Sequence, residues 1–199
     1  MARELGLHSR ALANAELRVD AISLALADAR LPGDAEAELI ETGRVLDEWL
    51  EVDAPSSELR ADFGDLLLPA VLTAGSGHEA VVAAAALAAC ERAGLSFGVI
   101  ASRRHLYLAH TALAEPYVLA PRFGWRFVEA TDLREGALTW LCPHELAARA
   151  LDAMYERATI CGLVDVALKA GELRVEMPMD NSTQQAHRTE LAMARARFN

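Results

Sequence analysis

Apolar residues recur every three or four positions through residues 1–70, and this spacing predicts helices. In the first helix the apolar face consists of Leu12, Ala15, Val19, Ile22, Leu26 and Ala29. The turn residues 31–34 end this helix, and Asp34 is suited to cap the next one. The second apolar face consists of Leu39, Gly43, Leu46 and Leu50. A short third helix is expected from Glu58 to Leu68.

The central segment begins with residues 77–95, an apolar stretch that ends in a glycine and predicts a buried helix. Short runs rich in strand-forming residues follow it. They are Phe97–Ala101, Leu106–Ala109, Tyr117–Leu119 and Arg126–Val128. Prolines at both ends of the third run predict that it is short or lies at an edge of the sheet.

Helical spacing returns after Asp132, and Pro143 is suited to the first position of a helix. Further helices are expected over 164–170 and 184–197, the last one starting with a capping box formed by Ser182 and Gln185. We therefore expect one α+β domain over residues 1–199. Its parts would be N-terminal helices (1–70), a helix with a small antiparallel sheet (71–135), and C-terminal helices (140–199).

The composition narrows the classes of function. With 53% hydrophobic and 24% charged residues, the chain is able to bury a core. Its net charge of -10 argues against broad binding of nucleic acid, although a local basic groove remains open. The residues that would form it are Arg103, Arg104, Arg122 and Arg126. The low aromatic content of 6% argues against platforms that stack bases.

The sequence predicts neither a membrane span nor a cofactor. The apolar run of residues 80–90 is shorter than the roughly 20 residues that cross a bilayer, and the N-terminus lacks a signal peptide. The three cysteines, Cys90, Cys142 and Cys161, have no spacing typical of a zinc site or a disulfide framework. We therefore expect a cytoplasmic protein without a bound metal, and its oligomeric state stays open.

Three stretches, residues 77–95, 99–108 and 119–124, resemble the SirB-type branch of bacterial transglutaminase-like proteins. Residues 151–180 are similar to the helical extension of that family. The resemblance implies a papain-like core with a small antiparallel sheet. It also implies a catalytic centre made of a cysteine, a histidine and an aspartate.

Only one of these three catalytic positions is retained. The resemblance places the family's histidine on His105, its nucleophile near Val81 and its aspartate on Ala120. A thiolate mechanism needs a nucleophile, a base and a group that orients the base. The sequence therefore predicts a protein that lacks the standard reaction, unless the register of the helix is shifted.

A shifted register would bring Ser76, His78 or Glu79 to the catalytic position. Ser76 and Glu79 also have the spacing of a capping box, which would give them a purely structural role. His78 has no structural role that the sequence identifies, so catalysis and structure stay equally open for it.

Other candidate site residues surround His105. In a strand, His105 and Tyr107 would point to one face and His110 to the other, so a metal site from the two histidines is disfavoured. Arg103 and Arg104 would bind a carboxylate or phosphate, or form an exposed basic pair. Trp125 would line the pocket or seal the core. Cys142 is a candidate for a reactive thiol at a helix start, or a gap-filling residue.

Two hypotheses of function follow. In the first, the chain is a non-catalytic module that binds a small molecule or a protein partner in the residual cleft. In the second, it is a repurposed enzyme in which His105 acts as acid or base, assisted by Tyr107, His78 or Glu79. The substrate would then be a small acidic metabolite held by Arg103 or Arg104. The missing nucleophile favours the first hypothesis.

Overall fold

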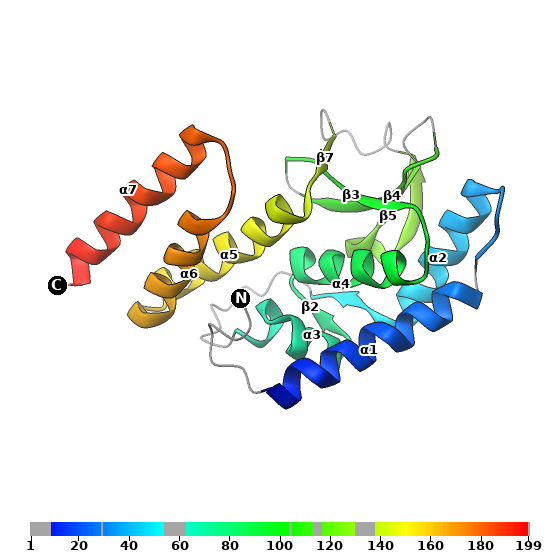
Figure 1. Ribbon diagram of the computed structural model, residues 1–199, viewed down its shortest axis with the longest axis horizontal. Helices are drawn as coiled ribbons and strands as arrows, with labels where there is room; N and C mark the ends of the chain where they lie inside the picture. The colour runs from blue at the N-terminus through cyan, green and yellow to red at the C-terminus, as the bar shows by residue number, and fades with distance from the viewer. Residues whose placement is uncertain are drawn as a thin grey trace.

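The protein is described by a computed structural model that covers residues 9–28, 30–53, 63–103, 105–113, 117–129 and 138–198. Helices pack against one face of a five-stranded antiparallel sheet and extend from one end of it, which confirms the predicted α+β class (Figure 1). The described helices are α1 (Ser9–Asp28), α2 (Ala35–Trp49), α3 (Leu68–Ala74), α4 (Glu79–Arg92), α5 (Pro143–Ile160), α6 (Val164–Glu176) and α7 (Asn181–Phe198).

The N-terminal helices form where the apolar spacing predicts them. The face of α1 that the periodicity identified is buried at Ala15, Val19, Ile22 and Leu26. Asp34 caps α2, because its Oδ1 accepts a hydrogen bond from the backbone N–H of Ala37 at 3.0 Å.

The described part of the short helix expected over 58–68 is not α-helical before Leu68. Residues 58–62 lie outside the described part, and residues 64–66 form a single 3-10 turn, η1 (Gly64–Leu66). The α-helix α3 begins only at Leu68, with Pro69 in its first turn. The fixed φ of proline suits a helix start, which accounts for the beginning of α3 at this point.

The central helix α4 packs against one face of the sheet (Figure 1). The sheet has the order β6-β5-β4-β3-β7. Its strands are β3 (Phe97–Ala101), β4 (Leu106–His110), β5 (Tyr117–Ala120), β6 (Arg126–Glu129) and β7 (Thr139–Leu141). Alanines on α4 allow the helix to lie close to the strands. All four predicted strands are therefore present, and β5 is short but lies inside the sheet.

Side chains alternate between the two faces of the sheet. Val99 and Leu108, which pair across β3 and β4, belong to the main core with α4. Ile100 and Tyr107, the next pair, belong to a separate apolar cluster on the opposite face. This alternation decides which residues reach the start of α4.

Three strands, β1, β2 and β7, escaped the sequence analysis because they are too short to show a pattern. β1 (Glu51–Val52) and β2 (Ser76–Gly77) form a parallel pair that joins the end of α2 to the start of α4. β7 pairs with β3 and closes one edge of the sheet. Both pairings hold segments that are distant in sequence.

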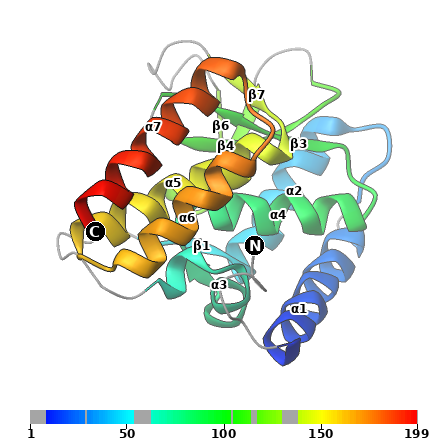
Figure 2. The same ribbon diagram turned by 60° about the vertical axis from the view of Figure 1, so that its left-hand side comes forward.

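The C-terminal helices α5, α6 and α7 lie side by side at one end of the molecule (Figure 2). Pro143 occupies the first turn of α5 as predicted. The start of α7 differs from the prediction, because Asp180, not Ser182, accepts the backbone N–H groups of Ser182 and Thr183. Across the described residues, none of the helices combines the length and apolar character needed to cross a bilayer.

Candidate functional site

The candidate site lies at the N-terminus of α4. Three other segments meet this point: β2, the turn before β4, and the 3-10 turn η2 (Pro121–Phe123). Packing brings together here residues that are more than forty positions apart in the chain, from Glu79 to Arg122.

Glu79 and His105 form the centre of the site. Oε1 of Glu79 lies 3.6 Å from Nδ1 of His105, and the two side chains are 10% and 20% exposed. Glu79 is the first residue of α4. The geometry therefore places Glu79 beside the histidine, while Val81, nearest to the expected nucleophile position, is buried in the main core.

A tight turn presents His105 to α4. The backbone N–H of Ser102 donates to the His105 carbonyl at 2.9 Å, and the His105 N–H donates to Ser102 Oγ at 2.9 Å. His105 therefore precedes β4 and does not follow its alternation. Tyr107 lies in the apolar cluster on the opposite face of the sheet. The structure does not bring Tyr107 to the carboxylate of Glu79, in contrast to the expectation that it assists His105.

Burial changes the proton affinity of Glu79. Loss of contact with water raises the pKa of its carboxyl group. A backbone hydrogen bond from Leu106 and the nearby His105 and Arg122 oppose this rise in pKa, but they are weaker. Glu79 is therefore easier to protonate than an exposed glutamate.

His78 is the N-cap of α4. Its Nδ1 accepts a hydrogen bond from the backbone N–H of Ala80 at 3.3 Å, which requires an unprotonated Nδ1. Burial lowers the pKa of His78, and it outweighs the opposing charge of Asp65. The charges of Arg157 and Arg122 lower the pKa of His78 further. The structure thus gives His78 the structural role that the sequence did not show.

The capping box expected from Ser76 and Glu79 does not form, because His78 takes the capping position. Ser76 instead lies in β2, paired with Glu51 of β1. Ser76 therefore lies two residues before the N-cap His78. This position is set by the β1–β2 pairing, which the sequence pattern could not reveal.

Arg122 belongs to the site, although the sequence identified it only as a member of a possible basic groove. It lies in η2, which packs against α4 and β4. Its charge lowers the pKa values of both His78 and Glu79. Its Nε is enclosed and has no hydrogen-bond partner among the described residues.

Trp125 holds this turn in place but does not line the site. It is 2% exposed, and its Nε1 donates to the Leu50 carbonyl at 2.6 Å. Gly124 and Trp125 both adopt positive φ angles, 66° and 51°. A Cβ on Gly43 of α2 would lie 2.7 Å from the Trp125 carbonyl oxygen. Of the two roles that the sequence left open for Trp125, the burial favours sealing the core, where it anchors η2.

Of the two arginines that precede His105, the structure describes only Arg103. Arg103 is exposed in the turn that presents His105. Arg104 lies outside the described residues.

An ion pair next to the site joins α5 to η1. Arg157 of α5 binds Asp65 of η1, with Nη2 donating to Oδ2 at 2.8 Å. The backbone N–H of His78 donates to the Asp65 carbonyl at 2.8 Å, so this ion pair braces the helix start.

A second carboxylate–imidazole pair lies at the other end of β4. Glu38 Oε1 is 3.2 Å from His110 Nε2, with side chains 9% and 7% exposed. His110 Nδ1 accepts from the Ala112 backbone N–H, so its Nε2–H donates to Glu38. The nearby Cys90 is buried, and this burial raises the pKa of its thiol. The pair is enclosed, and we interpret it as structural.

The exposed Cys142 is also structural in its observed contacts. It is the N-cap of α5: its Sγ accepts from the Glu145 backbone N–H at 3.4 Å. Glu145 Oε2 accepts from the Cys142 N–H at 2.7 Å, which completes a capping box. Among the described residues, no group of three or more histidines, cysteines and acidic residues is placed to hold a metal ion.

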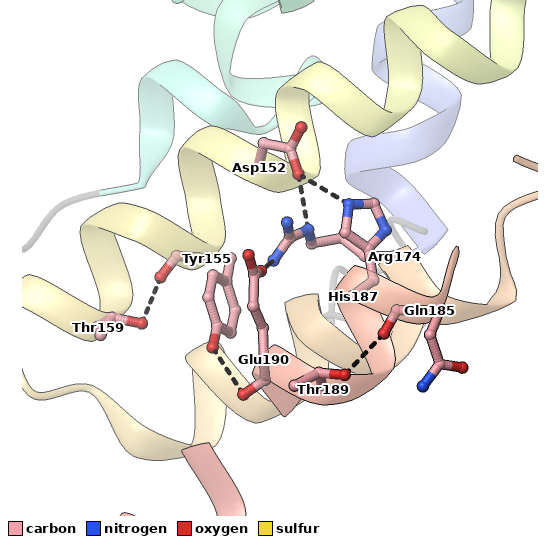
Figure 3. Close-up of polar contacts among 8 residues, drawn as sticks. All are labelled: Asp152, Tyr155, Thr159, Arg174, Gln185, His187, Thr189 and Glu190. Carbon is pink, nitrogen blue, oxygen red and sulfur yellow. Dashed lines mark hydrogen bonds and ion pairs between the residues drawn. The ribbon is translucent and has the colours of Figure 1, made fainter. Parts of the chain in front are cut away.

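A further polar cluster joins the C-terminal helices (Figure 3). The buried Arg174 of α6 lies between Asp152 of α5, at 2.6 Å, and Glu190 of α7, at 3.0 Å. Its guanidinium stacks on Tyr155, 4.6 Å from the ring centroid. His187 of α7 approaches Asp152 at 4.0 Å. These contacts fasten α7 to its neighbours.

A scan against protein-family models and a search of curated proteins found no match to this chain.

Proposed function

We propose that this chain is a transglutaminase-like protein, with a papain-like core, that lacks the Cys-His-Asp triad. It binds a small ligand or a protein partner where a catalytic centre would otherwise lie. The order of elements supports this proposal: a buried helix is followed by antiparallel strands, and a histidine directly precedes the second of them. Three cysteines without disulfide bonds fit a reducing compartment, and we propose the cytoplasm.

One observation carries the proposal. The first residue of α4, which faces His105, is a glutamate and not a cysteine. Cys90 lies near the opposite end of α4, and Cys142 caps α5. Ala120, at the expected aspartate position, is buried and has no group that could orient an imidazole.

The proposal is tested with glutamine-containing peptides, a fluorescent primary amine and a panel of peptide substrates. We expect that neither transfer nor cleavage exceeds the level of the His105→Ala variant. Turnover that depends on His105 would overturn the proposal.

The contact between Glu79 and His105 favours an alternative, an enzyme that uses this pair for acid–base chemistry on a small acidic metabolite. Burial raises the pKa of the Glu79 carboxyl group, so it holds a proton more readily than an exposed glutamate, which suits a general acid. Once a substrate is found, Glu79→Gln and His105→Ala should each remove turnover. An unchanged rate in His105→Ala would exclude this alternative.

A further inference from the structure

Two groups of opposite charge at the start of α4 each have a buried polar atom without a hydrogen-bond partner. Oε1 of Glu79 is enclosed, on a side chain that is nine-tenths buried, and the 3.6 Å to His105 exceeds a hydrogen bond. Nε of Arg122 is also enclosed without a partner among the described residues. An acceptor and a donor are therefore both unsatisfied in one small region, which is uncommon in folded proteins.

Arg122 and Glu79 belong to elements that pack together, η2 and α4, but the two groups do not pair. The charge of Arg122 acts on both His78 and Glu79, and η2 packs on α4. Nevertheless, no ion pair joins Arg122 to Glu79 within the part of the chain that the structure describes. A molecule that accepts from Arg122 and donates to Glu79 would satisfy both atoms.

The charges around the site favour an anion. Arg157 is neutralised by Asp65, and burial favours the neutral form of His78. Arg122 and the exposed Arg103 remain as positive groups, and the N-terminus of the 14-residue helix α4 adds positive potential. The carboxylate of Glu79 faces the same region.

We propose that Arg122 and Glu79 together bind a small oxyanion that carries a proton, as hydrogen phosphate does. Arg122 Nε–H donates to an unprotonated oxygen of the ligand, while Glu79 Oε1 accepts from its P–OH group. This inference rests on the proposed binding function and gives the chemical class of the ligand.

The carboxylate makes the site selective. Sulfate has nearly the same size and shape as phosphate but carries no proton at neutral pH. A sulfate oxygen next to the Glu79 carboxylate would be an acceptor facing an acceptor, so no hydrogen bond could form between them. A site that needs a donor from its ligand rejects such an analogue strongly.

Calorimetric titration of the full chain with inorganic phosphate and with sulfate at neutral pH tests the proposal. We expect saturable binding of phosphate and binding of sulfate that is weaker by about tenfold or more. A parallel titration with phenyl phosphate at about pH 6, where half of a phosphomonoester keeps a proton, separates two sources of the ligand. Binding of the ester indicates a phosphomonoester ligand, its exclusion indicates free phosphate, and either result supports the protonated oxyanion.

Two variants assign the binding to the named residues. Arg122→Gln should weaken phosphate binding about ten- to hundredfold, because a charged donor is lost. Glu79→Gln should allow sulfate to bind, because the amide offers a donor where the carboxylate accepted. Arg126→Gln removes an exposed arginine four residues away and should leave both affinities unchanged. Circular dichroism checks that each variant is folded. If Arg122→Gln does not fold, Arg122→Lys replaces it, because lysine keeps the charge but lacks the planar guanidinium group.

The proposal is overturned if the wild-type protein does not bind phosphate, if it binds sulfate equally well, or if Arg122→Gln keeps full affinity. Those results would leave the proposed binding function standing with another kind of ligand. The proposed binding function has a separate test, since turnover that depends on His105 would contradict it.

Discussion

Nδ1 of His105 faces a carboxylate, Oε1 of Glu79, at 3.6 Å, and this carboxylate stands on the first residue of a buried helix. A thiol at the same position would have the helix N-terminus and a neighbouring imidazole beside it, and both favour a thiolate against the opposing effect of burial. The local geometry for thiol chemistry is therefore present without the thiol.

Glu79→Cys should accordingly create a reactive cysteine. We expect it to be alkylated by iodoacetamide at mildly acidic pH. Peptide mass spectrometry of samples alkylated across a pH series measures the rate at each cysteine.

The double variant Glu79→Cys/His105→Ala provides the control. The thiol introduced at position 79 should need a higher pH for the same rate, since the imidazole is gone. Equal rates with and without His105 would contradict a functional contact between the two positions.

The pH dependence of stability should carry the signature of Glu79. Burial raises the pKa of its carboxyl group above the ordinary value of 4.5, so the folded chain holds this proton more tightly than the unfolded chain. The stabilisation that Glu79 contributes is present below its pKa in the unfolded chain. It is lost as the pH rises through the higher pKa of Glu79 in the folded chain. Glu79→Gln removes the titrating group, so the variant should gain on the wild type as the pH increases. Urea unfolding between about pH 4 and pH 7 measures this, and parallel curves for the two proteins would exclude it.

The elements of the fold could be predicted wherever periodicity was long enough to read. The apolar face of α1 and the cap at Asp34 both followed from local sequence. β1, β2 and β7 could not be predicted, because strands of two or three residues show no alternation and are fixed by partners distant in the chain.

The candidate site was predictable only in part, for a similar reason. Glu79 and His105 were both named from sequence, whereas the place of Arg122 depends on how η2 packs on α4. The parity that paired His105 with Tyr107 assumed that the strand begins before His105. It begins at Leu106, after a turn closed by Ser102. Because the strand begins one residue later than assumed, His105 lies on the side of α4 and Tyr107 lies on the opposite face of the sheet.

His78 should contribute a dependence of the opposite sign. Burial lowers its pKa below the ordinary 6.5, so the unfolded chain binds this proton more readily. Stability from His78 is present above the ordinary pKa and is lost as the pH falls through the folded one. His78→Asn keeps a capping side chain without titrating, and it should reduce the loss of stability below about pH 6. His78→Ala should also lose about 1 kcal/mol at neutral pH from the missing cap. Unfolding free energies at about pH 5 and pH 7 distinguish the two effects.

The buried pair of Glu38 and His110 should behave as a unit. His110→Leu leaves the carboxylate buried without its donor, which we expect to cost about 3–5 kcal/mol. Replacing both residues by leucine removes the orphaned charge, so the double variant should recover much of this loss. Denaturant unfolding of the two single variants and the double variant gives the coupling energy. A double variant whose loss equals the sum of the single losses would contradict the pairing.

Arg174 should control how firmly α7 is attached. Arg174→Met keeps a long side chain but removes the charge that Asp152 and Glu190 share, so α7 should open more often. We expect faster amide hydrogen exchange across residues 181–198 and earlier tryptic cleavage after Arg188. The matched control is Arg195→Met, which removes an exposed ion pair with Glu172 on the same two helices. Because exposed pairs contribute less than about 1 kcal/mol, exchange in this control should stay close to that of the wild type. Equal exchange in the two variants would show that α7 is held by Leu191 and Ala194, its buried apolar residues, and not by the network around Arg174.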